Sequence, residues 1–281
     1  MIFGDYECHA LDLGEFWVDG GAMFGIIPKL EWQSQMVVDD SNRVRLKTRS
    51  LLIQGNDRNI IVDTGFGNKL SQELMFYYGI ENNPIDMNLI LSGFELDVHH
   101  ITDVILTHLH LDHTGGSTVK IGDKVEPTFP NAQYYVQTEQ WEQACNPHER
   151  DVASYITDDY MPLSSHNQLQ LIDGSITLFE GIELMASYGH TIAQQHVVVK
   201  GQDQSLFFCA DLVPTSAHIP VNWHMAYDNK PLDLFPEKDY FLRKAVRENW
   251  ILFFEHDPNI TAATVKEGPR WIQFDREVEF N

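Results

Sequence analysis

The sequence has little cysteine, few basic residues and no long hydrophobic run. Cys8, Cys145 and Cys209 are far apart and form no CxxC motif, so a disulfide framework is not expected, which fits a reducing compartment. The 19 basic residues against 41 acidic ones give a net charge of −22, which repels nucleic acid and anionic membrane surfaces. No apolar run approaches the ~20 residues of a membrane span, and the N-terminus lacks a basic and apolar leader. We therefore expect no nucleic-acid or membrane partner and a cytoplasmic location, or a secreted or periplasmic one if a signal precedes residue 1.

What the chain does contain is typical of a globular protein. Apolar residues make up 43% and charged residues 21%, enough to build a core. No repeat or linker divides the chain, so we expect a single domain over residues 1–281. Strand-like runs come in pairs joined by short turns, and single strands and helices lie between them. The paired runs are 50–54 with 59–63, 176–179 with 182–186, and 196–200 with 206–210; single strands are expected at 103–107, 133–136 and 250–254, and helices after 138 and over 239–249. This pattern favours an α+β layered sandwich.

The 13 histidines are unevenly distributed, and three of them follow the 103–107 strand in the segment THLHLDHTGG. His108 and His110 point to one side of an extended chain, because side chains alternate between faces. Asp112 and His113 follow where the chain must turn, and Gly115-Gly116 is expected to allow a sharp turn into a helix. A mixed set of imidazoles and carboxylates suits Zn²⁺, with Fe or Mn as alternatives.

Other strand ends carry further candidate ligands. His190, Asp211 and His256 each come just after an apolar run. Taken singly, each is more often a turn residue than a ligand. Together with the first cluster they make five histidines and two aspartates, which is enough for two metal ions.

These motifs resemble the metallo-β-lactamase superfamily. The ordered pattern begins at Asp63 in VDTGFGN, continues through THLHLDHTGG and ends at His256, so it spans most of the chain. The resemblance implies an α/β (α+β) fold, the four-layer αββα sandwich, with a dinuclear metal site at one edge of its two sheets. It implies that one metal is bound by His108, His110 and His190, that the other is bound by Asp112, His113 and His256, that Asp211 bridges them, and that Asp63 orients the ligands.

Within the superfamily, the residues narrow the branch. His110 in place of Glu argues against the flavodiiron branch, and Asp211 argues against the β-lactamases with a cysteine ligand. Cys209 is then assigned to strand packing. The chain is too short for the inserted domain of the nuclease branch. The sequence most resembles the N-acyl-homoserine lactonases and their phosphotriesterase-like relatives, in length and in the HLHLDHTGG motif.

A stretch over residues 16–29 is rich in glycine and large apolar side chains, as a loop lining an acyl pocket would be. Such a loop would place substrate-pocket residues at Phe16, Met23, Phe24 and Ile26. The alternative is that its apolar side chains cover the edge of the sheet.

The implied activity is hydrolysis of a lactone or carboxylic ester by a hydroxide that bridges two divalent metal ions. Zn is expected, with Fe, Mn or Co as alternatives. The two cations carry about +4 against about −3 from Asp112, Asp211 and hydroxide, which leaves a net positive site for a developing oxyanion. Asp112 is also a candidate for delivering the proton to the leaving group. For an acyl-homoserine lactone this reaction would be quorum quenching.

One position departs from the lactonases. They carry a tyrosine three residues after the bridging aspartate, where this chain has Pro214. His218 is the first candidate to replace its contact with the substrate carbonyl, and Tyr227 is the second.

Other functions remain open at this point. The same site suits an organophosphate triesterase. A glyoxalase II-type thioesterase would need a basic patch, which the acidic C-terminal third does not favour. The alternative of a different class is a metal-binding module without catalysis. In every enzymatic case the partner is a small ester or lactone, and the protein is a monomer or a homodimer.

Overall fold

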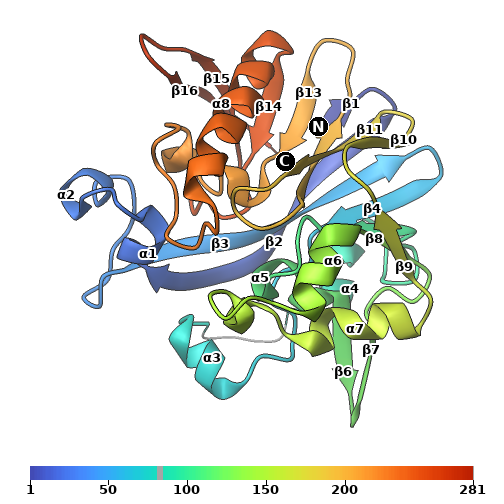
Figure 1. The fold of residues 1–281 in the computed structure, drawn as a ribbon. Helices are drawn as coiled ribbons and strands as arrows, with labels where there is room; N and C mark the ends of the chain where they lie inside the picture. The colour runs from blue at the N-terminus through green and yellow to red at the C-terminus, as the bar shows by residue number, and fades with distance from the viewer. Residues whose placement is uncertain (81–84, 281) are drawn as a thin grey trace.

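Two seven-stranded sheets pack face to face in the computed structural model, which describes residues 1–80 and 85–280 (Figure 1). The first sheet has the order β1-β2-β3-β4-β5-β8-β9, and the second runs β10 to β16 in sequence order. The strands of the first sheet are β1 (Ile2–Phe3), β2 (Tyr6–Asp19), β3 (Arg43–Gly55), β4 (Arg58–Val62), β5 (Asp103–Ile105), β8 (Gln133–Gln137) and β9 (Leu169–Ile172). Those of the second are β10 (Ile176–Phe179), β11 (Ile182–Ser187), β12 (Gln194–Val199), β13 (Ser205–Phe208), β14 (Trp250–Phe253), β15 (Ala262–Glu267) and β16 (Ile272–Val278).

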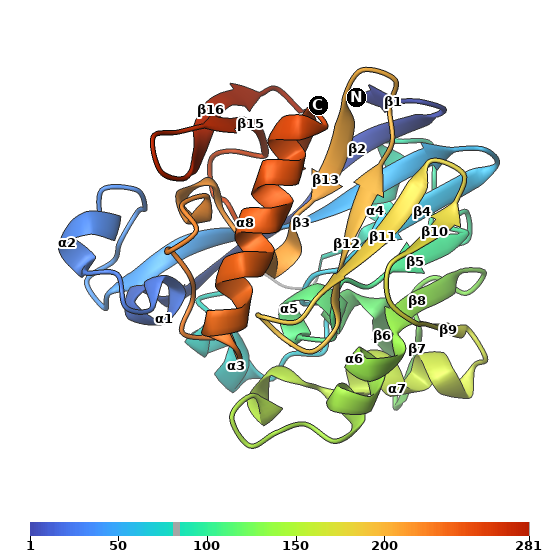
Figure 2. The same ribbon diagram turned by 45° about the horizontal axis from the view of Figure 1, so that its top comes forward.

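Helices cover the outer faces of the two sheets. The long helix α8 lies across the second sheet, whereas α4, α6 and α7 pack on the first (Figures 1 and 2). A small two-stranded sheet, β6 (Thr118–Ile121) with β7 (Lys124–Pro127), lies beside α7. The helices are α1 (Gly20–Phe24), α2 (Lys29–Trp32), α3 (Gln72–Tyr77), α4 (Met87–Ser92), α5 (Leu111–Thr114), α6 (Thr138–Cys145), α7 (Thr157–Ser165) and α8 (Pro231–Arg247), with 3-10 turns η1 (Gly115–Ser117), η2 (Val152–Ser154), η3 (Ala210–Leu212) and η4 (Ser216–His218).

The strand sequences explain the four layers. In β4, Ile60 and Val62 enter the core between the sheets, while Ile61 faces the helices on the outer side. Because both faces of the strand are covered, the strand reads as a continuous apolar run with no polar alternation. Phe208 and Phe253 of the second sheet stack on each other in the central core, with ring centroids 5.3 Å apart. The predicted four-layer αββα fold is confirmed.

Two pairs of parallel strands bring the candidate ligands to one edge. β4 pairs with β5 in the first sheet, and β13 pairs with β14 in the second. Because parallel strands end on the same side of a sheet, the residues that follow them meet there. Asp63 follows β4, Asp211 follows β13 and His256 follows β14.

All three predicted hairpins are present, as β3-β4, β10-β11 and β12-β13. The C-terminal helix starts earlier than predicted, at Pro231, because proline is favourable in the first turn of a helix. No helix in the described part of the chain has the length and apolar character needed to cross a membrane.

The predicted role of Gly115-Gly116 is wrong in one respect. Helix α5 already begins at Leu111, and neither glycine has a positive φ. A side chain at Gly115 would overlap the carbonyl oxygen of Phe66, and one at Gly116 would overlap that of Thr64. The glycines therefore allow the segment after Asp63 to approach closely; they do not make the turn.

Candidate metal centre and its cavity

Four of the predicted ligands meet at the edge between the two sheets. His108, His110, His190 and Asp211 offer one ligand atom each, and these atoms lie within 4.8 Å of one another. The Nε2 atom of His108 lies 3.0 Å from Nδ1 of His110, and Nε2 of His190 lies 3.3 Å from that same Nδ1. All four residues are buried.

A second group lies beside the first and consists of Asp112, His113 and His256. Its histidines face each other through their Nε2 atoms at 3.2 Å. Asp211 faces both groups, because its Oδ2 lies 3.2 Å from Nε2 of His190 and its Oδ1 lies 3.3 Å from Nε2 of His256. The structure thus brings together all seven residues that the sequence predicts as ligands.

The donor chemistry of this cluster fits two cations. Nε2 of His110 is buried without a hydrogen-bond partner among the described residues. Several imidazole nitrogens converge at hydrogen-bond distance, where a neutral ring has one proton for two nitrogens. A buried polar atom without a partner costs free energy, and a bound cation removes that cost by accepting the lone pairs. Mixed nitrogen and carboxylate ligands are those of Zn²⁺ and similar metals.

Asp63 contacts His113 of the second group on the side away from the other ligands. Its Oδ1 accepts a hydrogen bond from the backbone N–H of Thr107 at 2.7 Å, and its Oδ2 accepts one from the Thr107 hydroxyl at 2.6 Å. Oδ2 also lies 3.0 Å from Nδ1 of His113, which fixes the tautomer that leaves Nε2 to face the cluster. Asp63 has a φ of 56°, an unfavourable backbone conformation of the kind found at functional sites. This geometry fits the orienting role that the resemblance implies.

The sequence did not predict two further carboxylates that lie against ligand imidazoles. Oδ1 of Asp228 lies 2.8 Å from Nδ1 of His190, and Oε2 of Glu255 lies 3.1 Å from Nδ1 of His113. Glu255 directly precedes a ligand, so its position after a buried strand was an available signal. Asp228 lies 38 residues from His190, and no spacing in the sequence connects the two.

Burial and neighbouring charges set the protonation of the cluster. Burial lowers the pKa of His108 and His110 well below the usual range, and the other imidazoles add to this effect. The neutral imidazole is the form that binds metal. Burial opposes ionisation of Asp211, but His190 and His113 outweigh it and hold the pKa of this carboxyl well below its usual range. Burial raises the pKa of Glu255, although His113 and His256 oppose this.

The cluster opens into a cavity of about 220 Å³, called the cluster cavity below. Asp112, His110, His190 and Asp211 form its floor. Its walls are formed by Phe16, Val18, Tyr78, Leu111, Arg150, Asp151, Ser154, Ala226, Tyr227 and Asn229. Phe16 and Tyr227, both expected at the substrate, are therefore in contact with this space.

His218 does not lie where a contact with the substrate carbonyl was predicted. It lies in η4, is fully buried and is absent from the walls of the cluster cavity. Its Nδ1 lies 2.7 Å from the hydroxyl of Thr215, and its Nε2 donates to the carbonyl oxygen of Met23 at 3.0 Å. The ring also stacks on Phe24 at 4.8 Å. Because both nitrogens are occupied, His218 fastens the α1 segment and does not replace the tyrosine missing at Pro214.

Three of the predicted pocket residues are also corrected. Met23 and Phe24 are buried, and Phe24 stacks on Trp32 at 5.0 Å, so both belong to the packing of α1 and α2 over the sheet edge. Ile26 is 81% exposed on the surface. None of the three forms part of the described wall of the cluster cavity. The alternative interpretation, that this segment covers the sheet, explains Met23 and Phe24.

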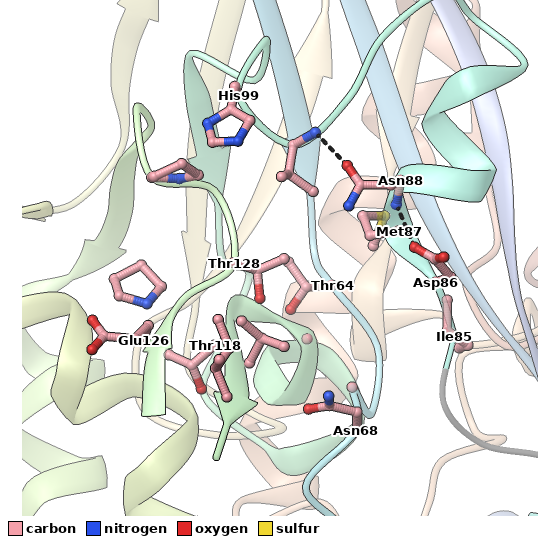
Figure 3. Close-up of a pocket in the computed structure, with 17 residues that line it drawn as sticks. Thr64, Asn68, Ile85, Asp86, Met87, Asn88, His99, Thr118, Glu126 and Thr128 are labelled. Carbon is pink, nitrogen blue, oxygen red and sulfur yellow. Dashed lines mark hydrogen bonds between the residues drawn. The ribbon is translucent and has the colours of Figure 1, made fainter. Parts of the chain in front are cut away.

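A second cavity, of about 600 Å³, lies behind the cluster between α4 and the β6-β7 hairpin (Figure 3). It touches Thr64 and Gly116 but includes none of the seven candidate ligands. Two of its polar side chains have structural roles: Asp86 accepts the N–H of Asn88 at the start of α4, and Asn88 accepts the N–H of Val98 (Figure 3). This second cavity therefore contains none of the candidate metal ligands.

Comparison with known proteins adds independent information. The family model of the metallo-beta-lactamase superfamily matches residues 44–256. An N-acyl homoserine lactonase of Bacillus thuringiensis is 25% identical over 219 residues, which cover 73% of this chain and 79% of the lactonase.

Solved structures agree with this fold. A probable metal-dependent hydrolase from Staphylococcus aureus is 30% identical, with a TM-score of 0.90 over 99% of this chain and 98% of that one. AidC, a dizinc quorum-quenching lactonase, is 18% identical, with a TM-score of 0.81 over 100% of this chain and 97% of that one, and supports the fold alone. The family model spans most of the chain and includes the entire ligand cluster. The chain belongs to the metallo-beta-lactamase superfamily and is a metal-dependent hydrolase of that superfamily.

Proposed function

We propose that this hydrolase opens a lactone or cleaves a carboxylic ester, with an N-acyl-homoserine lactone as the first substrate to test. The observation that carries the proposal is Asp211, whose two oxygens face two separate ligand groups on the floor of one cavity. The similarity to an N-acyl homoserine lactonase supports the choice of substrate. Opening such a signal would make the protein a quorum-quenching enzyme.

Two divalent cations are proposed for this floor, Zn before Fe, Mn or Co. His108, His110 and His190 would hold one cation, Asp112, His113 and His256 would hold the other, and Asp211 would contact both. When bound, such a pair supplies a nucleophile at neutral pH by lowering the pKa of water, and it polarises the scissile carbonyl.

Asp112 is proposed to move the proton. Its carboxylate is the most accessible of the seven ligands, with 23% of the side chain exposed, and it lines the cluster cavity. It lies 3.8 Å from Nε2 of His113 and 3.7 Å from Nε2 of His256, so it is placed between the ligands and the open space. A carboxylate there can take the proton of the attacking water and deliver it to the leaving oxygen.

Tyr227 is proposed to hold the substrate carbonyl in place of the tyrosine missing at Pro214. Its ring lines the cluster cavity and is 42% exposed. Its hydroxyl makes no hydrogen bond to any described residue, so it is available as a donor. A donor aimed at a developing oxyanion stabilises the transition state more than the ground state.

The activity is tested with an acyl-homoserine lactone, an aryl ester and a neutral phosphotriester, together with elemental analysis of the purified protein. We expect the lactone and the ester to be hydrolysed. Turnover of the phosphotriester alone would contradict the lactonase proposal. If no substrate is hydrolysed while metal is bound, the lactone and ester proposal is wrong.

Asp112→Asn separates catalysis from metal binding. We expect kcat to fall by roughly 10²-fold or more, because the amide cannot carry the proton, while most of the metal is retained. Asp123→Asn, in the exposed turn between β6 and β7, is the matched control. Unchanged kcat in Asp112→Asn would exclude the proton role.

A further inference from the structure

Arg150 is a cation on the wall of the cluster cavity, and it is held in one orientation. Its Nε donates to Oδ1 of Asn229 at 3.1 Å, and its Nη2 donates to the carbonyl oxygens of Ala226 at 2.6 Å and Asp228 at 3.2 Å. All three acceptors are neutral. The guanidinium is therefore fixed in place but its charge is not neutralised by these contacts.

The hydrogen bonds of Arg150 leave one part of the guanidinium unused. Nη1 makes no hydrogen bond to any residue that the structure describes. Arg150 is exposed, so Nη1 is accessible to a ligand and is not needed to anchor the 226–229 segment. A rigid guanidinium beside a reactive centre can bind an oxygen acceptor through its remaining N–H groups.

The walls around Arg150 differ in polarity. Ser154 lines the same cavity, and its hydroxyl also has no hydrogen bond within the described ranges 1–80 and 85–280. Phe16, Val18 and Leu111 give the same cavity an apolar stretch of wall. A ligand that fits this space carries an oxygen acceptor for the polar wall and hydrocarbon for the apolar one.

We propose that Arg150 determines specificity by binding a second carbonyl oxygen of the substrate, outside the scissile ester or lactone group. The inference rests on the proposed function, and it narrows the substrate class to esters and lactones with such an acceptor, for example an acylamino group on the ring. Arg150 and Ser154 donate to this oxygen, while the alkyl part contacts the apolar wall. A substrate without the acceptor makes neither of these hydrogen bonds, so its transition state is bound less tightly.

The test compares two lactones that share the five-membered ring. N-hexanoyl-homoserine lactone has an amide carbonyl beyond the ring, whereas γ-decalactone has only an alkyl chain. We expect the wild-type protein to have at least a tenfold higher kcat/KM for the amide lactone, and Arg150→Met to reduce that ratio by roughly 10- to 100-fold, as for hydrogen bonds to a charged group. Arg276→Met, an exposed arginine of β16, is the matched control and should leave the ratio unchanged.

The ratio separates recognition from structural damage. Loss of the 226–229 anchor would lower kcat/KM for both lactones together, and an unchanged ratio in Arg150→Met would overturn the proposal. Ser154→Ala removes a hydroxyl without touching the Arg150 anchors, and we expect it to reduce the same ratio by about three- to tenfold. If Arg150→Met does not fold, this variant and the wild-type ratio decide the question. Failure of the wild type to open either lactone would instead contradict the lactonase part of the proposed function.

Discussion

The two candidate metal groups differ in what orients their histidines. The partners of His113 lie inside the fold. Its Nδ1 is 3.0 Å from Asp63 and 3.1 Å from Glu255, and these two residues follow the buried strands β4 and β14. The partner of His190 lies in a loop: Nδ1 of His190 is 2.8 Å from the carboxylate of Asp228. The carboxylate of Asp228 also accepts the backbone N–H of Met225 at 2.8 Å, which ties it to the same loop.

As a result, the group that contains His190 is linked to the wall of the cluster cavity, and the group that contains His113 is not. The loop that carries Asp228 also carries Ala226, Tyr227 and Asn229, all on the wall of the cluster cavity. A substitution in that loop is therefore expected to alter both the orientation of His190 and the binding of the substrate. A change at Asp63 or Glu255 reaches only the ligands, because these two residues are fully buried behind them.

The largest effect is expected where the two groups meet. Asp211→Ala removes the carboxylate that faces both groups, so we expect loss of at least one of the two cations and a drop in kcat/KM of roughly 10³-fold. Elemental analysis and lactone kinetics measure the two effects, with Asp203→Ala in the exposed turn before β13 as the control. Full metal content in Asp211→Ala would show that the groups bind independently.

The variants Asp63→Ala and Asp228→Ala test this difference between the partners of His113 and His190. Each removes the partner of one ligand Nδ1, and loss of such a partner typically weakens metal binding by about 10- to 100-fold. Only Asp228→Ala should also raise KM, because it loosens the loop that bears Tyr227. Metal affinity by chelator competition and KM at saturating metal separate the two. Equal changes in KM in both variants would show that the Asp228 loop has no special link to the substrate.

Glu255→Gln should have a small effect, although Glu255 lies as near to His113 as Asp63 does. Burial raises the pKa of Glu255 and so favours the neutral carboxyl, which a neutral amide of the same shape imitates. The one close polar contact of Glu255 among the described residues is that of Oε2 with Nδ1 of His113 at 3.1 Å, whereas Asp63 accepts three hydrogen bonds. We expect metal affinity within about threefold of the wild type. A loss above about tenfold would show that Glu255 shares the orienting role.

The smallest effect on activity is expected at Lys238, a buried charge outside the metal groups. Burial lowers its pKa to about 7, although Asp228 and Cys209 oppose this, and its amine donates to the carbonyl of Trp223 at 2.6 Å. The unfolded chain binds more protons than the folded one between that value and the ordinary lysine pKa of 10.5, so the free energy of unfolding rises with pH over this interval.

In Lys238→Met this rise should disappear. We expect the variant to be more stable than the wild type by about 1–3 kcal/mol near pH 7, with a difference that shrinks toward about pH 10. Denaturant unfolding across this range measures the difference, with lactone kinetics as the parallel readout. A pH-independent difference would show that the Trp223 hydrogen bond, and not the charge, dominates.

The fold and the ligand set were predictable because their signals are local. THLHLDHTGG places four potential ligands within six residues, and each remaining ligand follows an apolar run that reads as a strand. The role of residues 16–29 was not predictable in this way. Met23 and Phe24 are apolar whether they line a pocket or pack under a helix, and only the contacts with Trp32 and His218 distinguish the two.

The sequence by itself therefore determined the strand ends and the candidate ligands that follow them, because periodicity and short spacing are local signals. The family and the four-layer fold followed from the resemblance of these motifs to a known superfamily. Only the tertiary structure decided what surrounds the ligands. Asp228 reaches His190 across 38 residues, and Arg150 reaches Asp228 across 78. Such contacts depend on how loops return over the sheet edge, and no local pattern in the chain encodes that path. The same holds for His218, which the chain sequence places near the bridging aspartate but which the fold turns into the core beneath α1.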